Sequence, residues 1–192
     1  MTLETKMNVI DKLFNFFQES GFEEYAGEKV SQLEHALQAA KLADDENYEE
    51  EVIIAALFHD IGHLMKTEND DAKMGIFGTK KHEFIGAEFL LKNGFSKKMY
   101  ELVIGHVRTK KYLVYKFPEY KTSLSEASLK TLEYQGGAMT KAEAEKFEKD
   151  ELFHLHLKMR EWDDKAKIPG LKTKSIAEYK LMAFNLLHST NR

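Results

Sequence analysis

The stretch VIIAALFHDIGH, residues 52–63, places an ionisable pair, His59 and Asp60, directly after a run that is typical of a buried core. Apolar residues precede His59 and His63 at spacings of three and four, so both imidazoles are expected near one apolar helix face. Asp60 lies about 100° further round such a helix and can converge with His59 only on something between them, such as a metal ion. The alternative is a hydrogen-bonded core pair, although burying a carboxylate without a cation costs on the order of several kcal/mol. The stretch alone leaves both interpretations open.

Composition restricts the kinds of protein that carry this stretch. The 192 residues, 43% of them hydrophobic, suffice for one well-packed domain, and we expect a single domain over residues 1–192. Because the chain has no cysteine, any transition metal must be held by His, Asp or Glu. The net charge of -4 is spread without a basic stripe, which argues against a nucleic-acid partner. With no signal peptide and no apolar segment long enough to span a bilayer, we expect a cytoplasmic protein without a membrane partner.

The whole chain has the pattern of an all-α protein. Apolar residues recur at spacings of three and four, and only Pro118 and Pro169 interrupt the chain. Ser96, Thr140 and Ser175 are suited to cap helix N-termini. The polar segment 66–79 is predicted to be a loop that lines the entrance to a site. Helices are predicted at residues 3–17, 30–43, 49–64, 82–91, 97–110, 123–134, 141–165 and 175–187.

Four more potential metal ligands stand apart from the pair at residues 59 and 60. His35 and His106 lie in predominantly apolar helical segments, SQLEHALQAAKLA and MYELVIGHVRTKKYLV. His82 opens a helix after the predicted loop, and Asp163 follows the only tryptophan. Each alone is a weak signal, because a single histidine near a core is usually a hydrogen-bonded core residue. Their order along the chain, H…HD…H…H…D, is more informative than any one of them.

In this order the sequence resembles the HD-domain superfamily, a helical bundle that holds metal through one early His, the His-Asp doublet and a late Asp. The resemblance implies an all-α HD-domain helical bundle with His35, His59, Asp60 and Asp163 as metal ligands. His82 and His106 are similar to the additional ligands of the dinuclear HD subgroups, and six N/O ligands can hold two irons. Asp60 could bridge the two ions and leave open positions for substrate and oxidant.

Longer segments narrow the resemblance. EYAGEKVSQLEHAL, AALFHDIGH, GHVRTKKYLV, LSEASLKTLEYQGGAM and REWDDKAK resemble the PhnZ-type oxygenases, mixed-valent di-iron enzymes that cleave the C–P bond of 1-hydroxyphosphonates. The resemblance covers roughly residues 25–180. It implies two Fe ions, Fe(II)/Fe(III) when active, with O2 as oxidant. It also implies a small-molecule phosphonate substrate such as 2-amino-1-hydroxyethylphosphonate, with glycine, or its N-methylated equivalent, and phosphate as products.

The resemblance also implies roles for individual residues. Tyr25 matches a tyrosine that can occupy an iron site before substrate arrives, and His63 is expected at the reaction centre and near the phosphonate. Glu28 matches the carboxylate that recognises the substrate's amino group; we favour a primary amine, and the residues leave a trimethylated amine open. The other expected phosphonate-binding residues are Lys110, Ser128, Thr131, Gln135 and Arg160. Without the resemblance we would prefer a different interpretation, in which Lys110 is a solvated lysine, Ser128 and Thr131 face out of a helix, and Arg160 pairs with Glu161 or a nearby acid.

Two other functions are compatible with the same residues. A dinuclear HD phosphohydrolase acting on a nucleotide or other phosphate ester could use the six ligands to activate water instead of O2. Tyr25 and Glu28 argue against it, because hydrolysis does not require them. A helical binding module that lost its activity is the more distant alternative, and the complete set of ligands argues against that loss.

Overall fold

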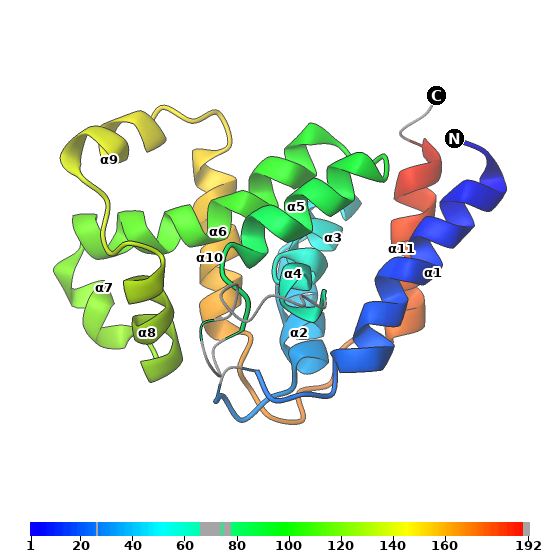
Figure 1. Ribbon diagram of the computed structural model, residues 1–192, viewed down its shortest axis with the longest axis horizontal. Helices are drawn as coiled ribbons and strands as arrows, with labels where there is room; N and C mark the ends of the chain where they lie inside the picture. Colours follow the sequence, from blue (N-terminus) through cyan, green and yellow to red (C-terminus); the bar gives the residue numbers. More distant parts are fainter. Residues whose placement is uncertain (26, 66–73, 75–77, 190–192) are drawn as a thin grey trace.

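The computed structural model describes residues 1–25, 27–65, 74 and 78–189, and within these residues it is a helical bundle without a regular strand (Figure 1). The prediction of an all-α fold is confirmed. The helices are α1 (Leu3–Ser20), α2 (Gln32–Asp45), α3 (Glu50–Phe58), α4 (Ile61–Leu64), α5 (His82–Lys92), α6 (Lys97–Lys116), α7 (Pro118–Ser123), α8 (Glu126–Tyr134), α9 (Lys141–Phe147), α10 (Phe153–Lys165) and α11 (Ile176–Ser189).

Helix α3 lies inside the bundle. Its residues 52–58 are all buried, and a helix that is apolar on every side is stable only when other helices enclose it. It packs against α2, α6, α10 and α11. The rings of Phe14 and Phe17 on α1 reach the ring of Phe58, with centroids 5.6 and 6.2 Å apart. The C-terminal end of α3, which is followed by His59, is therefore held from several sides.

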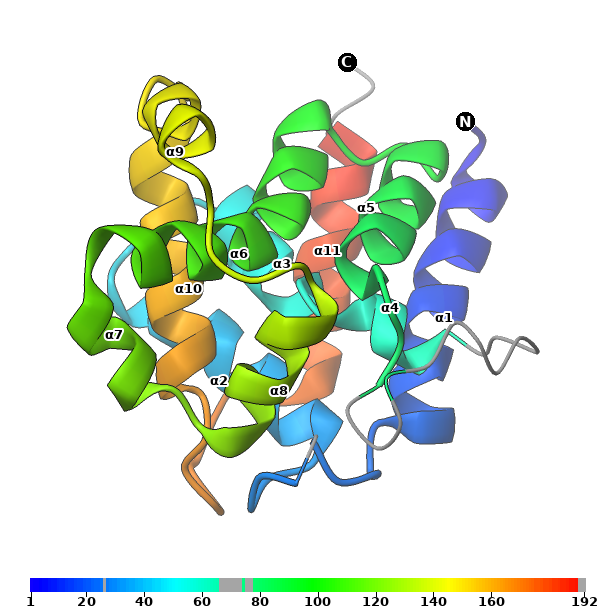
Figure 2. The ribbon, with the colours of Figure 1, turned by 60° about the vertical axis from the view of Figure 1, so that its left-hand side comes forward.

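Two groups of helices lie at opposite ends of the molecule. Helices α1 and α11 pack side by side at the end where the N-terminus lies (Figure 1). The short helices α7, α8 and α9 lie at the other end (Figure 1), and they come to the front when that end is turned toward the viewer (Figure 2). A second hydrophobic cluster of Tyr112, Met139, Ala144 and Phe147 packs α9 against α6. Helix α8 is tied to α6 by the hydrogen bond from Lys110 to the hydroxyl of Thr131 (2.8 Å).

The three predicted helix caps are confirmed. Ser96, Thr140 and Ser175 each accept a hydrogen bond from a backbone N–H three residues further on, which satisfies a donor that the first helical turn leaves free. The donors are Met99 (3.1 Å), Glu143 (3.3 Å) and Glu178 (3.3 Å).

The predicted helix at 49–64 is wrong at its most important point, because the chain leaves the helix at the His59-Asp60 pair. Asp60 has φ -106° and ψ 9°, so α3 ends before it and α4 begins after it. His59 Nδ1 lies 2.8 Å from the carbonyl oxygen of Ala56 and takes up an acceptor of the last turn. Gly62 lies so close to the start of α5 that a Cβ there would stand 2.0 Å from the carbonyl oxygen of His82. The break turns Asp60 toward the interior, and the glycine allows α5 to approach.

Other departures from the predicted elements are local. The predicted helix at 141–165 is wrong because residues 148–152 separate α9 from α10, and there the Asp150 carboxylate accepts a hydrogen bond from the N–H of Leu152 (3.0 Å). Helix α7 was not predicted; it begins at Pro118, a residue favoured in the first helical position. Most of the predicted entrance loop, residues 66–73 and 75–77, lies outside the described residues, whereas Met74 and Thr79 are buried.

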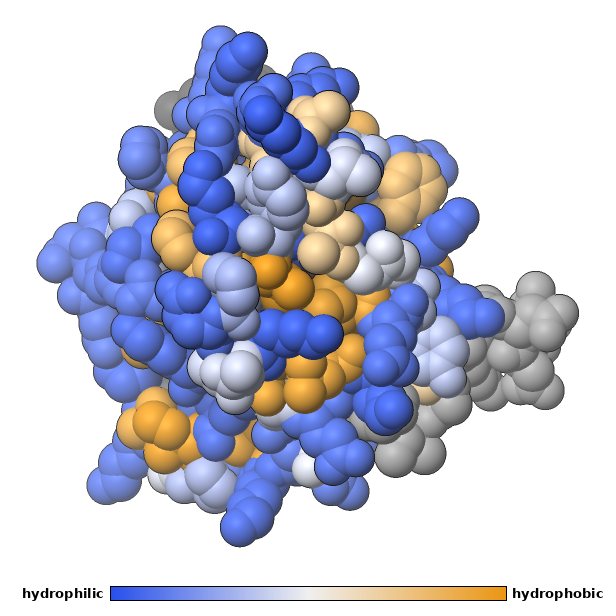
Figure 3. All heavy atoms as spheres, turned by 90° about the vertical axis from the view of Figure 1, so that its left-hand side faces the viewer, coloured by the Kyte–Doolittle hydropathy of each residue, from blue (hydrophilic) through white to orange (hydrophobic). Residues whose placement is uncertain are grey.

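The surface at the end formed by α7, α8 and α9 is mostly hydrophilic, with a hydrophobic area near its centre (Figure 3). Among the helices that the structure describes, none is long and apolar enough to cross a membrane.

Candidate metal centre and adjoining cavity

The six predicted metal ligands converge in the interior from separate elements. His35 comes from α2, His106 from α6 and Asp163 from α10, while His82 is the first residue of α5. All six are at most 7% exposed. Residues as far apart as 35 and 163 in the sequence thus meet in one place, His35 Nε2 lying 3.5 Å from Asp163 Oδ1.

The four histidines among them are oriented in the same way. Each places its Nδ1 near a backbone carbonyl oxygen, which can only accept, so the Nδ1 atom carries the proton and the Nε2 atom presents its lone pair. The carbonyl partners are Ala166 for His35 (2.9 Å), Ala56 for His59 (2.8 Å), Thr79 for His82 (3.3 Å) and Val103 for His106 (2.6 Å). This is the arrangement by which proteins prepare imidazoles as metal ligands.

The Nε2 atoms form two pairs, with the carboxylate of Asp60 between them. His35 and His59 bring their Nε2 atoms to 3.1 Å, and His82 and His106 do the same at 3.1 Å. Asp60 Oδ2 lies 3.7 and 3.4 Å from the first pair, and Oδ1 lies 3.1 and 3.2 Å from the second. Each carboxylate oxygen therefore belongs to one histidine pair.

This arrangement fits two metal ions. Two Nε2 lone pairs about 3 Å apart repel each other unless a cation or a proton lies between them. The buried Oδ1 atom of Asp60 has no hydrogen-bond partner, as expected for an oxygen that is reserved for a ligand. Among the described residues, the groups able to hold an ion are His35, His59 and Asp163 on one side and Asp60, His63 and His82 on the other.

The buried carboxylates give the metal-free centre a negative charge, which favours protonation of a neighbouring histidine. Burial lowers the pKa of the His59 imidazole, but the charge of Asp60 overcomes this effect and raises that pKa to about 9. Although burial opposes it too, the pKa of Asp60 is held well below its ordinary value by the charges of His59 and His82. Without metal a proton serves as the counter-charge, and metal binding releases it.

Tyr25 lies against the first histidine pair. Its hydroxyl donates a hydrogen bond to Asp60 Oδ2 (2.8 Å), and its ring stacks on His35 with the centroids 3.8 Å apart. Burial, and next the charge of Asp60, raise the pKa of the Tyr25 phenol well above its ordinary value, so the phenol keeps its proton in the metal-free protein. Asp60 Oδ2, the carboxylate oxygen that faces the first histidine pair, thus accepts a hydrogen bond from Tyr25 in the metal-free protein.

His63 lies against the second pair. Its ring stacks on His82 at 3.7 Å, and its Nδ1 accepts a hydrogen bond from the backbone N–H of Thr79 (2.9 Å). Burial, and next the charge of His82, lower the pKa of His63 well below its ordinary value. The neutral ring therefore carries its proton on Nε2 and can donate one hydrogen bond there.

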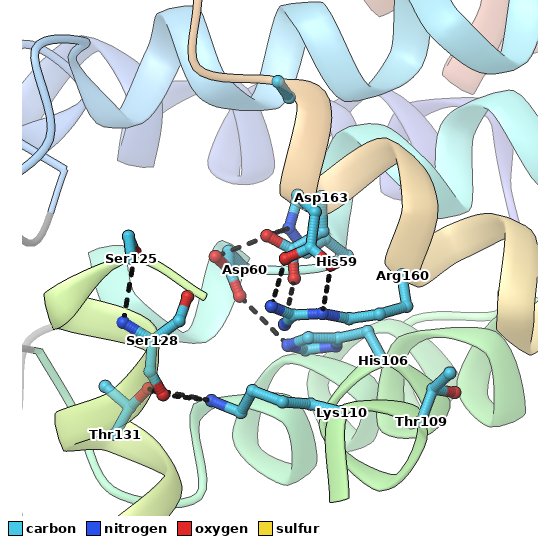
Figure 4. A network of polar contacts seen from close by, with 12 residues as sticks. His59, Asp60, His106, Thr109, Lys110, Ser125, Ser128, Thr131, Arg160 and Asp163 are labelled. Atoms are coloured by element: carbon cyan, nitrogen blue, oxygen red, sulfur yellow. Dashed lines mark hydrogen bonds and ion pairs between the residues drawn. The ribbon is translucent and has the colours of Figure 1, made fainter. Parts of the chain in front are cut away.

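A cavity adjoins the centre and brings together the predicted substrate-binding residues. It is lined by Tyr25, Glu28, Asp60, His63, Lys110, Ser128, Thr131, Gln135 and Arg160, and by residues that had no predicted role, among them Gln32 and Lys167. Lys110 reaches across from α6 to α8 and donates to the Thr131 hydroxyl at 2.8 Å (Figure 4). Burial lowers the pKa of the Lys110 ammonium to about 7, and the nearby Arg160 guanidinium contributes to the decrease. The cavity combines an uncompensated amine with hydroxyl groups, a set of donors suited to an oxyanion.

Arg160 faces the same cavity but is more strongly engaged than the sequence predicted. Its Nη1 donates to Asp163 Oδ2 at 2.7 Å (Figure 4). Its Nε donates to the hydroxyl of Tyr120 at 2.8 Å, and its Nη2 pairs with Asp164. The alternative that it pairs with a neighbouring acid is therefore correct for part of its donors. Because a guanidinium has five N–H groups, one donor on each terminal nitrogen remains for a ligand. Tyr120 and Asp164 were missed, although Asp164 directly follows a predicted ligand.

Glu28 lies at the cavity as predicted, but with a cation beside it that the sequence analysis missed. Lys167 Nζ lies 2.9 Å from Glu28 Oε1, and both side chains are less than one-fifth exposed. Burial raises the pKa of Glu28, but hydrogen bonds from Ser125 and Lys167 outweigh this effect and leave the pKa below its ordinary value. The signal for Lys167 was its position four residues after Asp163 in the REWDDKAK segment.

Comparison with known proteins agrees with this geometry. Residues 32–180 match the model of the HD domain family. The chain is 41% identical over 170 residues to the hydroxymethylphosphonate dioxygenase of Gimesia maris, with 88% of this chain and 84% of the relative covered. It is 36% identical over 171 residues to the glycine-betaine-forming 1-hydroxy-2-(trimethylamino)ethylphosphonate dioxygenase of Leisingera caerulea, with 86% and 84% covered. An uncharacterised protein of Acanthamoeba polyphaga mimivirus is 40% identical over 190 residues, with 98% and 87% covered.

The chain therefore belongs to the HD domain family. Within that family it belongs to the PhnZ-type oxygenases, the group in which the two named dioxygenases fall.

Proposed function

We propose that this protein is a di-iron oxygenase that cleaves the C–P bond of a 1-hydroxyphosphonate with O2. The observation that carries the proposal is the placement of Asp60 between two histidine pairs, at the wall of a cavity that also presents Lys110 and Arg160. The names of the two dioxygenase relatives support phosphonate chemistry. Six nitrogen and oxygen ligands without a thiolate are suited to iron. Two irons in the Fe(II)/Fe(III) state would supply the one-electron chemistry with O2 that a protein side chain cannot provide.

The reaction needs no external reductant. A 1-hydroxyphosphonate, R–CH(OH)–PO3H2, and one O2 contain the atoms of one carboxylic acid, R–COOH, and one phosphoric acid. The carbon atom is oxidised, O2 is reduced, and the C–P bond is replaced by bonds to oxygen. The proposal therefore requires one O2 to be consumed for each phosphate released.

In this proposal the protein binds and orients the phosphonate. Lys110 and the two free N–H groups of Arg160 bind the anion, and the Ser128 hydroxyl donates a hydrogen bond to it. The Thr131 hydroxyl, which donates to the Ser128 carbonyl at 3.1 Å, turns to the anion when the anion binds. Gln135, at the end of α8, lines the same cavity and completes the set with the N–H donors of its side-chain amide. Since four of these residues lie on or next to α6 and α8, the distance between these helices sets how well the anion fits.

Tyr25 and His63 act on opposite sides of Asp60 in this proposal. The Tyr25 hydroxyl protects the Asp60 side of the first histidine pair until the substrate hydroxyl replaces it. His63 remains neutral and donates from Nε2 to an oxygen atom at the second pair. The Tyr25 ring stacks on His35 and the His63 ring stacks on His82, and this stacking fixes the orientation of both side chains beside the proposed metal ligands.

The test follows O2 uptake and phosphate release by iron-reconstituted protein supplied with 1-hydroxyphosphonates. Hydroxymethylphosphonate, 2-amino-1-hydroxyethylphosphonate and its trimethylated derivative are the three substrates to compare. We expect phosphate to appear with an equal amount of O2 consumed, and to stop without O2. Phosphate released at the same rate under anaerobic conditions would establish hydrolysis, and the phosphohydrolase alternative would replace the oxygenase. Lys110→Met should abolish turnover, with Lys111→Met as the control for loss of a neighbouring positive charge.

A further inference from the structure

We propose that Lys167 determines the substrate class by neutralising Glu28, so that the cavity selects a 1-hydroxyphosphonate whose carbon substituent carries no positive charge. Hydroxymethylphosphonate is the smallest such compound. The inference rests on the proposed function, and it replaces the sequence-based expectation that Glu28 reads an ammonium group. Two observations support it, the contacts of Lys167 and the hydrogen bonds that hold its backbone.

Lys167 makes the contacts that an ammonium ligand would make at Glu28. Its ammonium group lies 2.9 Å from Glu28 Oε1, 3.4 Å from the hydroxyl of Ser125 and 6.0 Å from the ring centre of Tyr25. A carboxylate, a hydroxyl and an aromatic face are together the partners that recognise an ammonium ligand. The protein thus provides an amine-binding group and fills it with its own amine.

The backbone around Lys167 is fixed, which makes the pair a lasting feature of the cavity. Gln38 holds the next residue, Ile168, with two hydrogen bonds, from its amide nitrogen to the carbonyl (2.8 Å) and from the N–H to its amide oxygen (3.0 Å). The preceding carbonyl, of Ala166, accepts from His35 Nδ1 at 2.9 Å. Because both neighbours are held by buried side chains of α2, Lys167 cannot leave Glu28 by a movement of its backbone alone.

Electrostatics then disfavours a second cation. Because Coulomb energies between unit charges a few ångströms apart are similar in size and opposite in sign for the two partners, repulsion from Lys167 would largely offset the attraction of an incoming ammonium for Glu28. An uncharged substituent meets no such repulsion and leaves the existing pair intact.

The experiment compares two substrates in three proteins loaded with iron. We expect the wild type to use hydroxymethylphosphonate with a kcat/KM at least tenfold above that for 2-amino-1-hydroxyethylphosphonate. Lys167→Gln should shift this ratio at least tenfold toward the amine, because Glu28 is then free to accept it. The double variant Glu28→Gln/Lys167→Gln should lose that shift, since no carboxylate remains. Lys165→Gln, which removes an exposed lysine that pairs with Glu161, is the matched control and should keep the wild-type ratio.

A wild-type preference for the amine, or a ratio that moves less than tenfold in Lys167→Gln, would overturn the inference. Equal shifts in the single and double variants would also overturn it, because the effect would then not pass through Glu28. Failure of the proposed function is seen separately, as the absence of O2-dependent phosphate release from both compounds. In that case the same ratios are measured as anaerobic binding constants by calorimetry, and the same tenfold criterion applies.

Discussion

The buried ammonium group of Lys110 should lower the free energy of unfolding, and substituting this residue measures by how much. Its side chain is buried, with 3% exposure. Burial, and next the Arg160 guanidinium, lower the pKa of its ammonium group from 10.5 to about 7. Since a pKa difference of one corresponds to about 1.4 kcal/mol, the charged amine is about 5 kcal/mol less favourable in the folded protein than in the unfolded chain.

The sign of the pH dependence follows from these pKa values. Between pH 7 and 10.5 the unfolded chain binds more protons at this lysine than the folded protein does, so the contribution of Lys110 to stability rises with pH. Below pH 7 both states are charged and the full penalty is present. Lys110→Met removes the penalty together with one hydrogen bond to Thr131, worth about 1 kcal/mol. At pH 6 we expect the variant to be more stable than the wild type by about 2–4 kcal/mol.

The assay is urea unfolding of the metal-free protein, followed by circular dichroism from pH 6 to pH 9. The stability advantage of Lys110→Met should shrink by roughly 1.4 kcal/mol for each pH unit above 7. Lys111→Met, at the neighbouring position, should show no such change. Lys110→Met should also weaken phosphonate binding by roughly 2–5 kcal/mol, because it removes a desolvated charge partner. A variant that is less stable than the wild type at pH 6, or whose difference from it is independent of pH, would refute the reasoning.

Metal analysis should find about two Fe per chain in the wild type. His82→Ala should retain about one, and Asp60→Ala neither, because Asp60 is the carboxylate that faces both histidine pairs among the residues that the structure describes; iron retained in full by Asp60→Ala would remove the bridging role. Tyr25→Phe should lower the free energy of unfolding of the metal-free protein by about 1.5–3 kcal/mol, the value of a hydrogen bond to a charged acceptor, as measured by urea titration. Gly62→Ala should cost about 1–3 kcal/mol in the same titration, since its Cβ would collide with the carbonyl of His82, and an unchanged midpoint would contradict the close approach of α5.

The predicted elements were accurate where periodicity and capping act within a single helix. The starts of α6 and α9 follow from Ser96 and Thr140, whose hydroxyls act over three residues. The break at Asp60 could not be found in this way, because a continuous apolar helical pattern runs through it. The break accompanies two interactions, the close approach of α5 to Gly62 and the hydrogen bond from His59 Nδ1 to the carbonyl of Ala56. The position of α5 is set by tertiary packing.

The sequence by itself determined the helical class, the restriction to nitrogen and oxygen ligands and, through the ordered His and Asp residues, the six candidates for the centre. Local periodicity and side-chain chemistry suffice for these because neither depends on how the helices pack. Only the tertiary structure decided which ligands pair, that Asp60 lies between the pairs, and that Arg160 is shared between Asp163 and the cavity. It also decided that Glu28 meets Lys167, 139 residues away in the chain. Such pairings depend on distances between elements, which packing sets and no local pattern encodes.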